Sequence, residues 1–161
     1  MKRRWIAGLF LACFIISGCN RSAEHQQAPD FTLEPLEKTA PVTLSALHQK
    51  SPVLLIFWAT WCPSCVDEIP ALNEIRSQYS EDQLQLLAVN VQESREQIAA
   101  FAKKHPMQYP ILLDETGDVA ARYGLVGLPA SVLLAKGGEI LYYGFSLPPN
   151  LDQWLEPRRV Q

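Results

Sequence analysis

The chain of 161 residues has few of the features found in nucleic-acid-binding, metal-binding or repetitive proteins. It shows no internal repeat and no low-complexity segment. Its 14 lysines and arginines are outnumbered by 17 acidic residues and form no basic stripe, so no nucleic-acid partner is expected. Its three histidines, His25, His48 and His105, lack the spacing of metal ligands. The apolar segment 6–16 is shorter than the roughly 20 residues that a membrane-spanning helix needs.

The start of the chain carries the pattern of an export signal. Three basic residues, 2–4, precede the apolar segment 6–16. The segment Ile16-Ser17-Gly18-Cys19 resembles the lipobox of bacterial lipoproteins, which implies removal of residues 1–18 and acylation of Cys19. An uncleaved anchor is the alternative. Residues 19–28 are then a polar tether to the lipid membrane, 29–157 a single domain, and 158–161 a tail.

Cysteine is scarce, and this reading accounts for each of the four cysteines. Cys13 would be removed with the signal, and Cys19 would be acylated. Cys62 and Cys65 would remain with each other, so that no odd thiol is left in an oxidising compartment.

The most informative segment is Trp61-Cys62-Pro63-Ser64-Cys65, which follows the apolar run 53–58 almost directly. Two cysteines three residues apart, where a buried strand leads into a helix, can close a small reversible disulfide. The helix N-terminus favours a thiolate there. A permanent stabilising disulfide is the alternative, although so small a loop restrains the unfolded chain little. A zinc site would require further ligands, and haem attachment would require histidine where Val66 stands.

The remaining patterns predict one α/β domain with a mixed sheet and helices on both faces. The predicted strands are 30–33 and 42–43, forming an N-terminal hairpin, then 53–58, 84–91, 111–113, 131–135 and 139–143. A helix with Pro70 inside it follows Cys65 and should kink there. A further helix begins with a capping box at 94–97 and ends in a last turn at 103–105. Two more helices cover 118–123 and 149–155.

The segment 57–65, together with Leu128-Pro129 downstream, resembles the thioredoxin-fold proteins. Within them the chain is similar to the membrane-tethered TlpA/ResA/DsbE group of thiol–disulfide oxidoreductases. The motifs that carry this narrower resemblance are 28–33, Glu68-Ile69-Pro70, 88–94 and 123–129. The resemblance implies a thioredoxin fold with a central mixed sheet, an N-terminal hairpin and an inserted helix and strand.

Two departures from thioredoxin itself limit what the resemblance carries over. Ile56 stands where thioredoxins have a buried aspartate, and Pro63-Ser64 replaces the usual Gly-Pro. The proton relay and the reduction potential of thioredoxin are therefore not transferred to this chain.

The resemblance also implies roles for named residues. Cys62 is expected to be the partly exposed attacking thiol with a lowered pKa, and Cys65 the thiol that resolves the mixed disulfide. Glu68 lies on the same helix face as Cys65 and is expected to take its proton, as its counterpart in ResA-like members is thought to tune the cysteines. An ordinary solvated glutamate is the alternative.

The substrate surface is expected around a second loop. Pro129 is predicted to be cis and to face the cysteines, with Leu128 offering its backbone to substrate. Trp61 is expected to be an exposed aromatic contact for a partner, and Trp58 to be a core residue. No cofactor and no metal are expected.

These features together predict a lipid-anchored oxidoreductase on the extracytoplasmic, periplasmic side. Its expected partners are disulfide-containing exported proteins, such as apocytochrome c, and a membrane thiol electron donor. A reductase is favoured, and both the inner and the outer membrane are compatible with Asn20 after Cys19. The alternatives are an oxidase or isomerase of the same fold, and a copper metallochaperone or other binding module.

Overall fold

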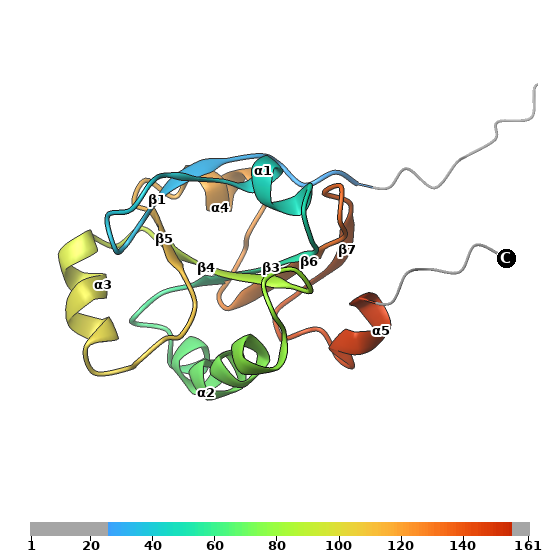
Figure 1. Cartoon of the computed structure of the whole chain (residues 1–161). Helices are drawn as coiled ribbons and strands as arrows, with labels where there is room; N and C mark the ends of the chain where they lie inside the picture. Colours follow the sequence, from blue (N-terminus) through green and yellow to red (C-terminus); the bar gives the residue numbers. More distant parts are fainter. Residues whose placement is uncertain (1–25, 156–161) are drawn as a thin grey trace, which may run out of the picture.

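The computed structural model describes residues 26–155, which fold around one seven-stranded mixed sheet (Figure 1). The strand order is β2-β1-β5-β4-β3-β6-β7. The strands are β1 (Thr32–Pro35), β2 (Val42–Thr43), β3 (Val53–Trp58), β4 (Gln85–Val91), β5 (Ile111–Asp114), β6 (Ala130–Leu134) and β7 (Ile140–Gly144). The helices are α1 (Leu44–His48), α2 (Pro63–Gln78), α3 (Arg95–Ala102), α4 (Asp118–Arg122) and α5 (Leu151–Leu155).

The central strand β3 has the bounds that its continuous apolar run predicted, and all six of its residues are buried. It pairs in parallel with β4, which pairs in parallel with β5, and it pairs antiparallel with β6. A strand covered on both faces has no solvent side, which is why its sequence does not alternate. The predicted α/β architecture with a central mixed sheet is confirmed.

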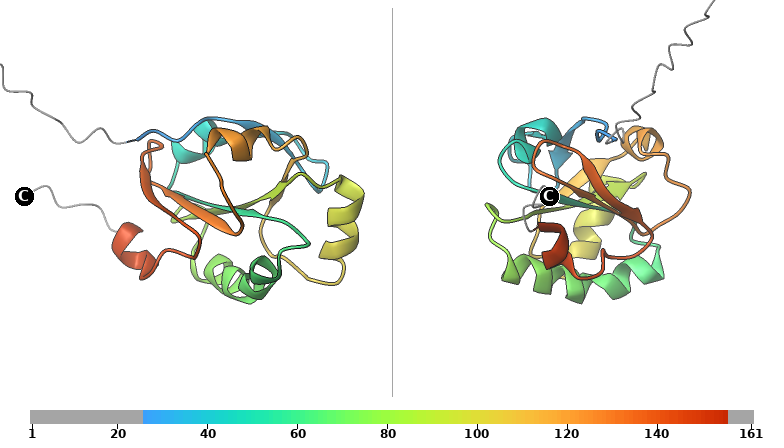
Figure 2. Two further views of the ribbon diagram at one scale, coloured as in Figure 1. Left: turned by 180° about the vertical axis from the view of Figure 1, so that it is seen from behind. Right: turned by 90° about the vertical axis from the view of Figure 1, so that its right-hand side faces the viewer.

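Helices cover both faces of the sheet, as Figures 1 and 2 show: α1 and α4 lie on one face, and α2 and α5 on the other. Side chains of β3 alternate between two cores. Ile56 and Trp58 belong to the core under α2, which also holds Cys62 and Cys65. Phe57 belongs to the core that packs against α4. The redox motif therefore lies over one of the two buried cores.

The predicted N-terminal hairpin is confirmed, and it joins the main sheet. β1 pairs with β2 antiparallel, with Leu33 opposite Val42, and also pairs with β5. The fold begins earlier than the expected boundary at residue 29. Within the segment assigned to the tether, Ala28 N donates to Gly138 O at 2.9 Å, and Gln26 O accepts from Ile140 N at 2.9 Å. The edge strand β7 has unpaired backbone groups that these residues satisfy.

Three further local details differ from the sequence predictions. Helix α3 ends at Ala102, so residues 103–105 form the turn after it, where two backbone N–H groups share Phe101 O. The last helix begins at Leu151, because Asn150 takes a left-handed conformation (φ 49°) after the two prolines. The short helix α1 was not predicted. Pro70 lies inside helix α2, as predicted.

Several predictions fall outside the described residues. These are the signal peptide 1–18, the acylated Cys19 and the tail 158–161. Between residues 26 and 155, no helix is both long enough and apolar enough to span a membrane.

Candidate active site

The redox pair lies where β3 leads into α2. Cys62 is the N-cap residue of α2, with an extended backbone, and Pro63 occupies the first helical position, where its missing N–H has no effect. Cys62 and Cys65 form a disulfide, with their Cα atoms 5.3 Å apart. The backbone N–H of Cys65 donates to Cys62 Sγ at 3.3 Å. This N–H and the dipole of a 16-residue helix would stabilise a Cys62 thiolate after reduction.

The expected partial exposure of Cys62 is wrong for this oxidised state. Cys62 and Cys65 are each 3% exposed, and both pack into the core under α2. As the N-cap, the Cys62 side chain folds over the first turn of the helix toward Cys65. The neighbouring Trp61 is 69% exposed, as expected, and Trp58 is buried in the core, also as expected.

A buried carboxylate supports the loop that carries Cys62. Glu93 is 6% exposed and accepts hydrogen bonds from Thr60 N at 2.7 Å and from Asn90 Nδ2 at 2.8 Å. The Thr60 hydroxyl donates to the same carboxylate. Gln92, immediately before it, has a left-handed backbone (φ 59°) that turns the chain at the end of β4. These contacts join β4 to the segment between β3 and the redox pair.

Sequence analysis did not assign this role to Glu93. The residue was noted only within the family-like segment 88–94. A usable signal was present, because an acidic residue lies two positions after the end of a buried strand that is parallel to β3. The carboxyl ends of parallel strands meet at one edge of a sheet, and that edge also carries the redox pair.

Glu68 lies one turn beyond Cys65 on α2. It is half-buried, and its Oε2 atom is buried without a hydrogen-bond partner among the described residues. Burial raises the pKa of this carboxyl above its usual value. Glu68 therefore differs from a freely solvated surface glutamate.

The second predicted loop also reaches the site. The Leu128–Pro129 peptide bond is cis, as predicted, and Pro129 is buried directly before β6. Leu128 and Trp61 line the same groove, which has a volume of about 440 Å³. The other residues lining this groove are Val91, Gln92, Gly117, Ala120, Ala121, Leu125 and Gly127. Two further apolar side chains are exposed: Val126 lies within this loop, and Phe145 directly follows β7.

In residues 26–155, no three His, Cys, Asp or Glu side chains come together as candidate metal ligands. His48 lies on α1, and His105 follows α3, where its ring stacks on Phe101. The only cysteines in the described part of the chain are the two in the disulfide.

Comparison with known proteins identifies the family. The model of the AhpC/TSA family matches residues 25–143. The chain belongs to the AhpC/TSA family. Among its relatives, the thioredoxin-like protein YneN of Bacillus subtilis is 33% identical over 97% of this chain and 99% of its own length. The thiol–disulfide oxidoreductase ResA of Geobacillus kaustophilus is 37% identical over 80% of this chain and 74% of its own length.

A solved structure agrees with the fold. The crystal structure of a thiol:disulfide interchange protein DsbE from Chlorobium tepidum, described there as putative, superposes with a TM-score of 0.70. It is 31% identical and covers 82% of this chain and 92% of its own. The predicted thioredoxin fold is thus confirmed. This AhpC/TSA member is a thiol–disulfide oxidoreductase of the ResA and DsbE type, with a Cys62–Cys65 pair.

Proposed function

We propose that this protein reduces disulfide bonds in exported proteins from a membrane-anchored position outside the cytoplasm. The observation that carries the proposal is the redox pair at a helix N-terminus, beside a groove that Trp61 and Leu128 share. An unfolded or loosely folded polypeptide could lie in this groove with its disulfide against Cys62. The exposed apolar side chains around it suit such substrates better than a charged ligand.

In the proposed reaction the reduced protein starts with two thiols. The Cys62 thiolate attacks one sulfur of the substrate disulfide, forming a mixed disulfide and releasing the other substrate sulfur as a thiolate. Glu68 takes the proton of the Cys65 thiol, and the Cys65 thiolate then attacks Cys62 Sγ. The second substrate sulfur leaves as a thiolate. Two electrons pass to the substrate, and the Cys62–Cys65 disulfide remains.

The cycle needs a thiol donor that returns two electrons to Cys62–Cys65. We propose a membrane dithiol protein in this role, because the proposed anchor at Cys19 would place both proteins at one surface. The basic residues 2–4, the apolar segment 6–16 and the lipobox-like segment 16–19 support this location. Exchange of Cys19 for serine should move the protein from the membrane fraction to the soluble fraction after export.

The substrate class is tested by trapping. A Cys65→Ser variant should hold exported proteins as mixed disulfides at Cys62, and these should be released by added dithiol. The matched Cys62→Ser variant should hold none. A peptide with an oxidised Cys-x-x-Cys-His segment, the type of site found in apocytochrome c, provides a direct substrate in solution. Failure of the wild-type protein to reduce this peptide would exclude apocytochrome c as a target.

The direction of electron flow is tested by the reduction potential of the pair. A value near about −270 mV is that of a reductase, and a value near about −120 mV is that of an oxidant. The second result would replace the proposed reductase by an oxidase that introduces disulfides into exported proteins.

A further inference from the structure

The side chains under α2 include two buried polar groups of complementary chemistry. In the described part of the chain, neither Glu68 Oε2 nor the Tyr109 hydroxyl has a hydrogen-bond partner. Buried polar groups in native proteins are rarely left unpaired, so each such atom requires an explanation. A phenolic O–H donates and a carboxylate accepts, which makes these two groups suited to each other.

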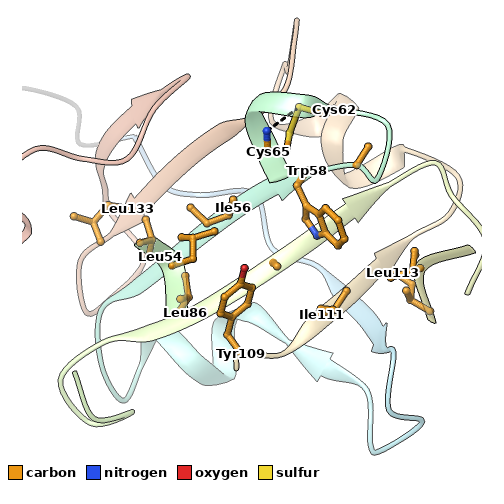
Figure 3. Close-up of a cluster of buried hydrophobic side chains, with 14 of the residues drawn as sticks. Leu54, Ile56, Trp58, Cys62, Cys65, Leu86, Tyr109, Ile111, Leu113 and Leu133 are labelled. Carbon is orange, nitrogen blue, oxygen red and sulfur yellow. Dashed lines mark hydrogen bonds between the residues drawn. A yellow bond between two sulfur atoms is a disulfide. The ribbon is translucent and has the colours of Figure 1, made fainter. Parts of the chain in front are cut away.

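Tyr109 is held against α2 by the segment before it. Asn73 of α2 donates from Nδ2 to Pro106 O at 2.9 Å, and its Oδ1 accepts from Gln108 N at 2.9 Å. Tyr109 is 4% exposed and belongs to the same core as Cys65. Figure 3 shows its ring over the sheet, with the hydroxyl directed toward the end of this core that holds Cys65.

The charges around this pair are few. Burial and then the charge of Glu68 raise the pKa of Tyr109, so the phenol stays protonated and remains a donor. Burial alone raises the pKa of Glu68. Asp67 and Glu74 of α2 are exposed. Arg76 of α2 forms an ion pair with Glu81 at 3.0 Å. The other charged or titratable groups packed beside α2 are Lys103, Lys104 and His105 after α3, Tyr142 of β7, and Tyr79, whose hydroxyl donates to Asp152 of α5.

We propose that Tyr109 is a positioning residue for Glu68: its O–H donates to a water molecule that in turn donates to the carboxylate, and this bridge holds the charged form beside Cys65. A bridging water is a normal way to join two polar groups that are too far apart for direct contact. The proposal rests on the proposed function, in which Glu68 takes the proton of Cys65. Tyr109 gives up no proton in that step.

The test separates the two chemical steps of the pair. All variants are full chains in detergent that carry Cys13→Ser and Cys19→Ser, so that only Cys62 and Cys65 react. Reduced protein is mixed with an aromatic disulfide, 5,5′-dithiobis(2-nitrobenzoate). One coloured thiolate is released when Cys62 attacks, and a second is released when Cys65 resolves the mixed disulfide. The rate of each phase is measured against pH.

In Tyr109→Phe, the acid limb of the second phase should move up by about one pH unit, because a hydrogen bond to a charged group is worth about one pKa unit or more. Resolution should therefore be about tenfold slower on that limb and unchanged at alkaline pH, with the first phase unaffected. The matched control is Tyr79→Phe, which removes another phenol from a carboxylate, that of Asp152. Its profile should match that of the wild type.

A second comparison uses Glu68→Gln. Tyr109→Phe should add no further shift in this background, because the charged partner is gone. An unshifted profile for Tyr109→Phe, or the same shift with and without Glu68, would overturn the proposal. If Glu68→Gln itself leaves the second phase unchanged, the role of Glu68 in the proposed function fails, and the role of Tyr109 fails with it.

Discussion

Exchange of Glu93 for glutamine should destabilise the domain and loosen the loop before Cys62. The Glu93 carboxylate is 6% exposed and accepts hydrogen bonds from Thr60 N, the Thr60 hydroxyl and Asn90 Nδ2. Glutamine has nearly the same shape, but it offers one acceptor oxygen and turns an N–H₂ group toward a donor. The bonds that survive also lose the assistance of the charge.

The size of the effect follows from these contacts. A hydrogen bond to a charged group contributes about 1.5–3 kcal/mol, and a buried donor left unpaired costs about 1–3 kcal/mol. Because part of the bonding is retained by glutamine, we expect the free energy of unfolding to fall by about 2–3 kcal/mol. This is a large share of the roughly 5–15 kcal/mol typical of a domain. The urea midpoint should fall by about 1–2 M.

The assay is urea unfolding of the oxidised protein, followed by far-UV circular dichroism. The matched control is Glu96→Gln, the same change at an exposed glutamate in the first turn of α3, where the helix dipole contributes only about 0.5 kcal/mol. Equal losses of stability in the two variants would refute the assigned role of Glu93. The rate at which Cys62 attacks a disulfide should also fall in Glu93→Gln but not in Glu96→Gln. The reason is that Thr60, which Glu93 holds, lies two residues before Cys62.

Three further predictions concern other parts of the domain. Burial raises the pKa of Glu68 in the folded state, so the folded protein binds this proton more tightly than the unfolded chain. The free energy of unfolding of the wild type relative to Glu68→Gln should therefore fall as the pH rises above about 4.3. Urea titrations at several pH values measure this difference, and a difference that is independent of pH would contradict the prediction. Gly117 (φ 78°) and Gly124 (φ 65°) are both left-handed, but a Cβ at Gly117 would lie 2.7 Å from Gln92 Nε2, whereas a Cβ at Gly124 would meet nothing within 4 Å. Alanine at Gly124 should lower the free energy of unfolding by about 1 kcal/mol, and alanine at Gly117 should lower it by about 0.5–1 kcal/mol more. Thermal unfolding measures both losses, and equal losses would contradict the steric contribution at Gly117. Trp61→Ala should raise KM for a disulfide peptide several-fold while changing stability by less than about 0.5 kcal/mol, because the side chain is 69% exposed, and a loss of stability instead would assign Trp61 to the fold.

Local signals in the sequence were sufficient for most of the fold. The apolar run 53–58 predicted β3 without error, since a strand buried on both faces has a continuous signature. Ser94 and Gln97 form the predicted capping box, which depends only on residues close in sequence. The cis bond before Pro129 was predicted from family resemblance, because no local pattern distinguishes a cis proline from a trans one.

The parts that were missed depend on contacts between distant segments. The burial of Cys62 depends on how β3, α2 and the core beneath them pack. The link between Thr60 and Glu93 joins residues 33 positions apart. The segment 26–28 has a polar composition typical of a linker, and it became part of the fold only because the edge of β7 was free. Composition does not show which edge will be open.

The position of residues 26–28 determines how the domain is presented to other molecules. Gln26 accepts a hydrogen bond from Ile140, the first residue of β7. Ile140 lies opposite Leu134 of β6, and Leu134 lies opposite Val53, the first residue of β3. Cys62 follows the opposite end of β3, about 20 Å away along the strand. The described part of the chain therefore begins at one end of the domain and has its redox pair at the other. A support, label or fusion partner attached through the N-terminus would leave the reactive pole facing outward, so biosensor surfaces and fusions of this domain should be built from that end.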